Sequence, residues 1–253
     1  DFVVGFRQSA RSTSSRSAPR LNPTKWLLAQ PQTCDTVNAK SLERSVKDLN
    51  ERITAGMSSG DTDVEKEKMV LIAAQNGMGT GKSHLVDRLT DILPFLKDGV
   101  TIKVSYSVGQ LLNHDVAKQD SHVACFLTRI VLGTALPSAV DVERYIDANG
   151  CFDWSSTAEV DNLAGYINGK YPGVPVLIAV DEMQLLRGKI VSEGRDGDAG
   201  FCGILWALRR LCVSVNRFRA WKANELCLGF VTALPTLNFT TVSQYSPLWL
   251  HPM

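Results

Sequence analysis

Three glycines, a lysine and a serine occur together in one short segment that follows a run of apolar residues. The segment reads Gln75-Asn76-Gly77-Met78-Gly79-Thr80-Gly81-Lys82-Ser83. Gly77, Gly79 and Gly81 lack side-chain bulk and adopt unusual backbone angles easily, so backbone N–H groups can approach a ligand closely. A helix that starts here adds the positive end of its dipole. Lys82 supplies a full positive charge and Ser83 a hydroxyl, so these residue types favour phosphate binding.

The segment resembles the Walker A motif of P-loop NTPases, G-x-x-x-x-G-K-[ST]. It departs from the motif at Asn76, where the first glycine is expected, and Asn tolerates left-handed backbone angles better than most residues. The resemblance implies that Lys82 neutralises the β- and γ-phosphates and that Ser83 ligates Mg²⁺. We expect His84, on the first turn of the helix, to pack or cap. The predicted nucleotide-binding residues are Asn76, Gly77, Met78, Gly79, Thr80, Gly81, Lys82, Ser83 and His84.

Two neighbouring carboxylates follow a second apolar run. Residues 174–180 (VPVLIAV) end at Asp181 and Glu182. Acids are common in turns that end strands, but this pair resembles a Walker B motif in the order that a P-loop protein requires. The resemblance implies that Asp181 holds the Mg²⁺ and that Glu182 polarises the attacking water as a catalytic residue.

A third apolar run, Leu226–Val231, is followed by Thr232. In the additional-strand class of P-loop ATPases, a polar residue at the tip of this strand senses the γ-phosphate. Thr232 matches that catalytic position by its place in the sequence. The equally weighted alternative is a plain strand end.

Strands and helices alternate along the core of the chain. We expect strands at Met69–Ala74, 100–106, Val174–Val180 and Leu226–Val231, and helices over 39–56, after Ser83, over Val123–Ala135 and around residues 204–215. Residues 140–172 predict one or two short helices. Continuous apolar strands between helices predict an α/β fold, here a three-layer α/β/α P-loop NTPase sandwich with a mostly parallel central sheet.

Residues 187–200 (RGKIVSEGRDGDAG) contain four glycines and mixed charge, which predicts a mobile loop. Arg209 and Arg210 lie on the helix that follows. Either could be an arginine finger for a neighbouring subunit in a homo-oligomer. We favour the alternative that both are structural or solvated, because most surface arginines have no catalytic role.

The motifs favour an ATPase similar to the AAA+ or STAND-like branches, with ATP and Mg²⁺ as cofactors and hydrolysis coupled to conformational change. The first alternative is a nucleotide-controlled switch or scaffold that hydrolyses ATP slowly or not at all and is one module of a larger protein. The chain is faintly similar to such modules, namely the NTPase modules of crinkler and retrotransposon-hot-spot proteins. The second is a helicase or translocase, because Asp181-Glu182-Met183-Gln184 resembles the D-E-x-Q motif of superfamily 1 helicases. The absence of an N-K-x-D guanine motif disfavours GTP, and the absence of L-S-G-G-Q disfavours an ABC-type ATPase.

The domain prediction separates residues 1–38 from an NTPase domain over 39–253, with its core at 68–235. Residues 7–25 have five basic residues and no acid, as in a solvated linker, a nucleic-acid-binding arm or a mitochondrial presequence. Too few residues follow Thr232 for the helical lid of an AAA+ protein. We expect either that the lid is absent or that the chain is one module of a larger assembly, with further domains or a protein partner.

The net charge of +1 does not by itself require nucleic acid or an anionic membrane as partner. No apolar run is long enough for a membrane span. The six cysteines show neither C-x-x-C pairs nor zinc-ligand spacing. We therefore expect free thiols in a reducing intracellular compartment, cytoplasm or nucleus, with mitochondria as an alternative.

Overall fold

The computed structural model describes residues 39–58, 66–67, 70–75, 82–107, 121–136, 138–152, 154, 157–233 and 248–249. Its elements follow one another as α2 (Ala39–Ser58), β1 (Leu71–Gln75), α4 (Lys82–Ile92), the 3₁₀ helix η2 (Pro94–Leu96), β2 (Val100–Ser105), α5 (Ser121–Ala135), α6 (Ala139–Asn149), α7 (Thr157–Lys170), β3 (Val176–Asp181), α8 (Met183–Ser192), α9 (Gly197–Phe218), η4 (Ala223–Glu225), β4 (Cys227–Ala233) and β5 (Leu248–Trp249).

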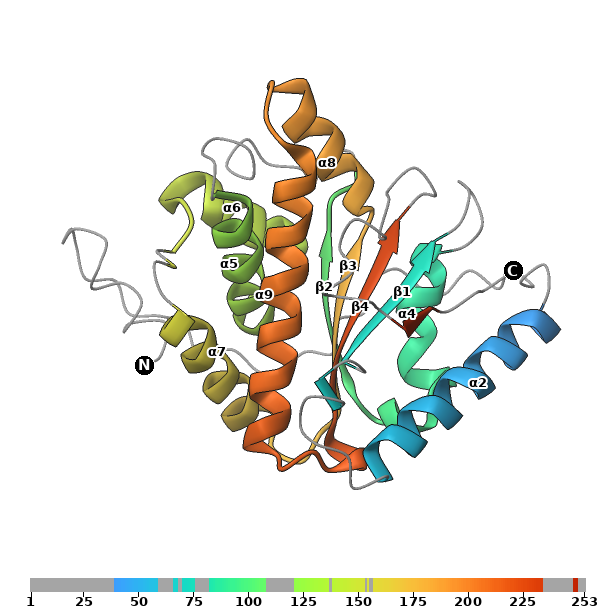
Figure 1. The fold of residues 1–253 in the computed structure, drawn as a ribbon. Coiled ribbons are helices and arrows are strands. Elements are labelled where there is room, and N and C mark those ends of the chain that lie inside the picture. The colour runs from blue at the N-terminus through green and yellow to red at the C-terminus, as the bar shows by residue number, and fades with distance from the viewer. Residues whose placement is uncertain are drawn as a thin grey trace.

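One parallel sheet forms the centre of the molecule (Figure 1). Its strand order is β2-β3-β4-β1-β5, and every described strand pair is parallel. Strand β4 follows β1 and β3 in sequence but lies between them in space. The mostly parallel sheet predicted from the continuous apolar runs is therefore confirmed, and β4 is an additional strand inserted between the two that end in the candidate motifs.

Helices cover both faces of the sheet. Alternate residues of each central strand point to opposite faces, and because both sets are apolar, both faces must be buried. Val176, Ile178 and Val180 of β3 belong to the core under α5, α7 and α9. Leu177 and Ala179 belong to the second core, under α4 and α2. The molecule is thus the predicted three-layer α/β/α sandwich, with α9 crossing one whole face (Figure 1).

The predicted helices are present with shifted ends. In α2, Leu49 and Ile53 are buried as the apolar spacing predicts. The segment 140–172 contains two helices, α6 and α7, and a turn follows at Pro172-Gly173. Ser138 is the N-cap residue of α6, and its hydroxyl accepts a hydrogen bond from the backbone N–H of Asp141 at 3.2 Å.

The prediction of a mobile loop at 187–200 is wrong. These residues form the second half of α8, a short turn at 193–196 and the start of α9. Met183, Leu186 and Ile190 are buried at helical spacing, which holds α8 on the core. The Asp196 side chain then caps α9 by accepting hydrogen bonds from the backbone N–H groups of Asp198 and Ala199, at 2.9 and 3.1 Å.

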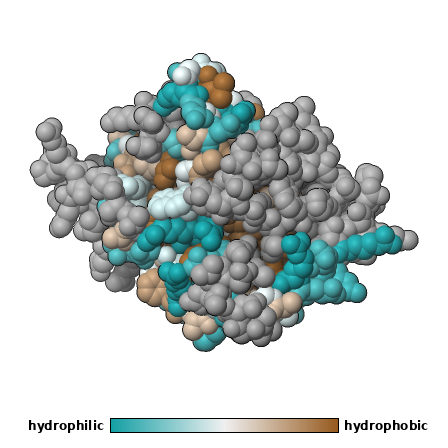
Figure 2. All heavy atoms as spheres, viewed as in Figure 1, coloured by the Kyte–Doolittle hydropathy of each residue, from teal (hydrophilic) through white to brown (hydrophobic). Residues whose placement is uncertain are grey.

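The glycines of this segment allow close helix packing instead of flexibility. A Cβ atom on Gly200 would lie 2.6 Å from Ile190 Cδ1, and one on Gly197 would lie 2.7 Å from Val191 Cγ2 and 3.0 Å from the Arg187 carbonyl oxygen. Helices α8 and α9 therefore form a tight hairpin, which rises beyond the sheet edge (Figure 1). Figure 2 shows apolar residues reaching the surface near its tip, where Val191 is 50% exposed.

Two glycine-to-alanine changes in this hairpin should have opposite effects on stability. Gly197→Ala should lower the free energy of unfolding by about 1 kcal/mol or more, because the new methyl group meets Val191 and Arg187. Gly188→Ala should raise it by about 0.5–1 kcal/mol, because Gly188 is an exposed helix-interior residue with no atom within 4 Å of the added methyl group. Urea denaturation of the two variants checks both signs. Equal effects would contradict the close-packing role of Gly197.

The expectation that the cysteines are free is wrong for one pair. Cys125 of α5 and Cys151, which follows α6, form a disulfide with a Cα–Cα distance of 5.4 Å. Spacing alone could not reveal it, because 26 residues separate the two in sequence. Cys202, Cys212 and Cys227 are free. The compartment expected from the sequence stays a prediction.

The basic residues 7–25 lie outside the described residues, so the alternatives for this arm are untested. Among the helices that the structure describes, none combines the length and apolar character needed to cross a membrane.

Candidate active site

The candidate catalytic residues of the two C-terminal motifs meet at the carboxyl edge of the sheet. Asp181 is the last residue of β3, and Thr232 is the last but one of β4. Helix α4 begins at Lys82, after the chain leaves β1 beside β4. Parallel strands end at the same edge, so the sheet brings together three segments that are distant in sequence.

Thr232 joins the two carboxylate residues through its hydroxyl group. The hydroxyl donates a hydrogen bond to Asp181 Oδ1, and its oxygen accepts one from the backbone N–H of Glu182 at 3.1 Å. Asp181 and Thr232 are buried, at 3% and 0% exposure. A hydroxyl has a single proton to donate, so in this arrangement that proton is committed to Asp181.

Glu182 has a left-handed backbone, with φ 59° and ψ 41°. This conformation costs a non-glycine residue on the order of 1 kcal/mol or more. Glu182 occupies the N-cap position of α8, but its side chain makes no capping hydrogen bond. The backbone turn lets the chain pass directly from a buried strand into a helix and leaves the Glu182 side chain partly exposed.

Lys103 of β2 is a further residue of this site that the sequence patterns did not single out. Its Nζ lies 3.8 Å from Asp181 Oδ2, and its side chain is only 17% exposed. The segment 100–106 predicted a strand, which β2 confirms, but gave no sign of a role for its lysine. Its place could have pointed to such a role. A lysine in the middle of a strand is largely buried when helices cover both faces of the sheet, and a buried charge needs a charged partner.

The donor groups fit a magnesium ion better than a metal that requires an all-protein cage. The described residues contain no group of three or more His, Cys, Asp or Glu side chains arranged to hold a metal. Mg²⁺ is commonly held by one or two carboxylates together with phosphates and water. Asp181 can supply one carboxylate in this mode, through Oδ2, because Oδ1 is hydrogen-bonded to Thr232.

The phosphate-binding segment itself lies largely outside the described residues. This applies to Asn76, Gly77, Met78, Gly79, Thr80 and Gly81. Lys82, Ser83 and His84 are described only as the first backbone turn of α4. The helix expected behind the loop is therefore present, and the contacts expected of its side chains stay predictions.

Arg209 and Arg210 both form ion pairs within the chain. Arg209 Nη2 lies 3.4 Å from Glu67 Oε2, and Arg210 Nη2 lies 2.8 Å from Asp161 Oδ2. Partial burial raises the pKa of Asp161, but hydrogen bonds from Ser214 and Arg210 outweigh this, and its pKa lies below its usual value. These contacts favour the structural interpretation of both arginines over that of an arginine finger.

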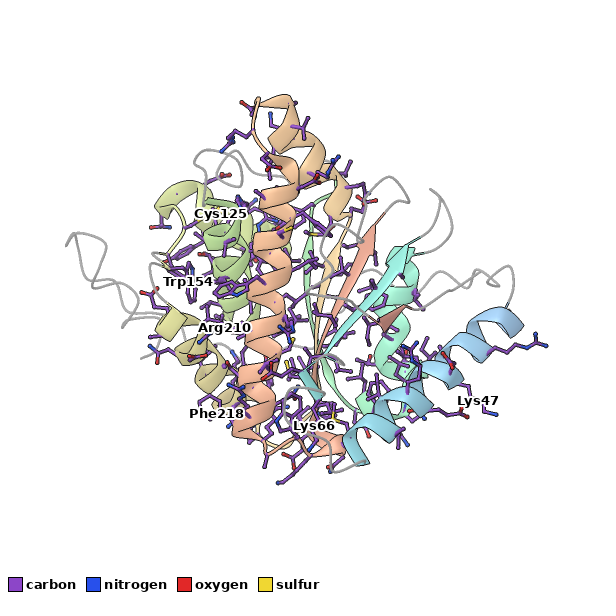
Figure 3. The ribbon with its side chains drawn as sticks, viewed as in Figure 1. Lys47, Lys66, Cys125, Trp154, Arg210 and Phe218 are labelled. Carbon is purple, nitrogen blue, oxygen red and sulfur yellow. A yellow bond between two sulfur atoms is a disulfide. The ribbon has the colours of Figure 1, made fainter. Side chains whose placement is uncertain are left out.

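A hollow of about 600 Å³ lies beside these arginines on the outer side of α9, and none of its lining residues belongs to the carboxyl edge. Figure 3 labels Arg210 and Phe218 along this helix. The lining residues are Glu67, Asp161, Trp206, Arg209, Arg210, Val213, Ser214, Arg217 and Phe218.

No family model matches the chain, and no curated protein matches it significantly. Two solved structures are distantly similar. One is a chain of "Structure of Drosophila ORC bound to DNA", with 10% sequence identity and a TM-score of 0.34. The match covers 100% of this chain and 54% of the ORC chain. In "Structure of Drosophila ORC bound to GC-rich DNA and Cdc6" the values are 13% and 0.28, over 94% of this chain and 34% of the other. The chain thus spans about half or less of either chain, and likenesses this low carry no argument about function.

Proposed function

We propose that the chain binds Mg-ATP at the carboxyl edge of its sheet and hydrolyses it. The observation that carries the proposal is the hydrogen-bonded unit of Asp181, Glu182 and Thr232 at the ends of two adjacent parallel strands. A further strand, β1, lies on the other side of β4 and leads toward α4. The glycine-rich segment connects β1 to α4, so it has the strand and the helix that a phosphate loop requires.

The residues have separate roles in this proposal. Lys82 and backbone N–H groups of residues 79–83 bind the phosphates, and Ser83 and Asp181 hold the Mg²⁺. The ion supplies neutralisation of the charge that develops on the phosphates. Glu182, partly exposed at the edge, accepts a proton from the attacking water. The reacting groups come from three segments, so their alignment depends on the sheet.

Thr232 acts in this proposal mainly by positioning its neighbours. Its hydroxyl orients the Asp181 carboxylate and at the same time holds the backbone of Glu182. Direct contact with the γ-phosphate, as implied by the resemblance, would require its proton to leave Asp181. The arrangement therefore links the carboxylate that holds the metal to the one that activates water.

Nucleotide binding and turnover by the chain, compared with Lys82→Ala, test the proposal. The parent should bind ATP in the presence of Mg²⁺ in preference to GTP and release phosphate. Lys82→Ala should weaken ATP binding about tenfold or more, because a charged hydrogen bond to phosphate is lost. Lys97→Ala is the matched control, since Lys97 is exposed in the turn before β2, at the opposite edge of the sheet. Undiminished ATP binding by Lys82→Ala would refute the assignment of the site.

A further inference from the structure

The Asp181 carboxylate is paired with a positive charge from the protein. Asp181 is 3% exposed, and a carboxylate taken out of water is costly unless it is hydrogen-bonded and paired. Thr232 satisfies Oδ1, and the Lys103 ammonium group lies 3.8 Å from Oδ2. Lys103 thus supplies the positive charge on the side of the carboxylate that Thr232 leaves open.

The position of Lys103 in the sheet explains how it reaches this carboxylate. In β2, Ile102 and Val104 are buried in the core under α5 and α9, so Lys103 points to the other face, that of α4. Leu177 and Ala179 of β3 face the same side, and Asp181 continues their alternation. Lys103 and Asp181 therefore project from neighbouring strands onto the face where α4, and with it the proposed phosphate loop, begins.

We propose that Lys103 is a built-in counter-ion of Asp181 that opposes binding of a divalent cation until nucleotide is present. The inference rests on the proposed function, in which Asp181 holds Mg²⁺. A divalent cation at Oδ2 would lie close to the Lys103 ammonium group, and the two positive charges share a single carboxylate. Repulsion between them weakens the binding of the free metal ion.

A nucleoside triphosphate removes this obstacle because it brings several negative charges to the same edge. The flexible stem of a lysine lets its ammonium group turn from the carboxylate toward phosphate oxygens. Metal and nucleotide then bind cooperatively, and by linkage each raises the affinity for the other by the same factor. The site is thereby selective for the metal–nucleotide complex over the free ion.

The binding of Mn²⁺ without nucleotide, followed by electron paramagnetic resonance, tests the inference. Lys103→Met should bind Mn²⁺ about tenfold more tightly than the parent, because the competing charge is gone. Lys103→Arg should bind it as weakly as the parent, since the charge is kept. Adding Asp181→Asn to Lys103→Met should abolish the gain, which shows that the metal occupies this carboxylate. The ratio of ATP affinities with and without Mn²⁺ should be smaller in Lys103→Met than in the parent.

A purely structural ion pair would give a different result. Lys103→Met would then lower the melting temperature without raising the affinity for Mn²⁺, and this outcome would overturn the inference. Lys103→Gln serves as a second variant if Lys103→Met does not fold. Failure of the proposed function is visible separately, because ATP binding by the parent would then be absent or independent of Lys82. Lys82-dependent ATP binding together with an unchanged metal affinity in Lys103→Met and Lys103→Gln refutes only the inference about Lys103.

Discussion

Replacing Glu182 by glutamine should reduce ATP hydrolysis by about a hundredfold or more while Mg-ATP binding is retained. The amide has the shape of the carboxylate but cannot accept a proton from water. The change leaves the backbone N–H of Glu182 in place, so its 3.1 Å hydrogen bond to Thr232 should persist. Asp181 and its contacts with Thr232 and Lys103 are likewise unaltered, so we expect metal and nucleotide affinity to survive.

Single-turnover phosphate release and equilibrium nucleotide binding measure the two effects separately. Glu193→Gln is the matched control, because Glu193 is an exposed acid at the other end of the same helix, α8. This control should hydrolyse ATP at the parental rate. If Glu182→Gln also did so, Glu182 would not activate the water. A parent chain that binds ATP without turnover would favour the nucleotide-controlled switch.

Replacing Arg219 by methionine should destabilise the fold by about 3 kcal/mol or more. Arg219 is 4% exposed at the end of α9, and burial lowers the pKa of its guanidinium group. Its Nη1 donates to the carbonyl oxygens of Val174 and Glu225, at 2.7 and 2.5 Å. Its Nη2 donates to the Tyr171 carbonyl oxygen at 2.8 Å, and its Nε to Asn168 Oδ1 at 3.1 Å. Methionine would leave these acceptors without their donor.

Arg217→Met is the control for this effect. Arg217 lies two residues earlier, but its side chain is 58% exposed and pairs with Glu67 at 2.5 Å. Exposed ion pairs contribute less than about 1 kcal/mol, so this variant should unfold at nearly the parental urea concentration. Similar losses in the two variants would show that the buried hydrogen bonds of Arg219 do not hold this end of the sheet together.

The order of apolar and polar residues was sufficient to predict those strands and helices whose residue types follow directly from their burial. Strand β3 is buried on both faces, so its run of apolar residues is continuous, and Asp181 marks the point where it reaches the sheet edge. Thr232 was placed by the same logic, and its hydrogen bond to Asp181 supports the grouping of the two residues.

The remaining features depend on contacts with a different helix or strand. Glycines and charges at 187–200 favour a loop locally, yet the lack of a side chain at Gly197 and Gly200 is what lets α9 lie against α8. The sequence of β2 does not distinguish Lys103 from the lysine of any alternating strand. Its role depends on the register of β2 against β3, in which Ser105 pairs with Asp181. In each case the decisive contact involves another element, which local sequence does not identify.

The close packing of α8 against α9 also has a mechanical consequence. Glu182 occupies the N-cap position of α8, and the close packing at Gly197 and Gly200 holds that helix against the start of α9. Helix α9 has 22 residues and so extends about 33 Å, ending beside Arg219 at the opposite side of the sheet. Two packed helices therefore connect the backbone of Glu182, at the carboxyl edge of the sheet, to Phe218 at its opposite side.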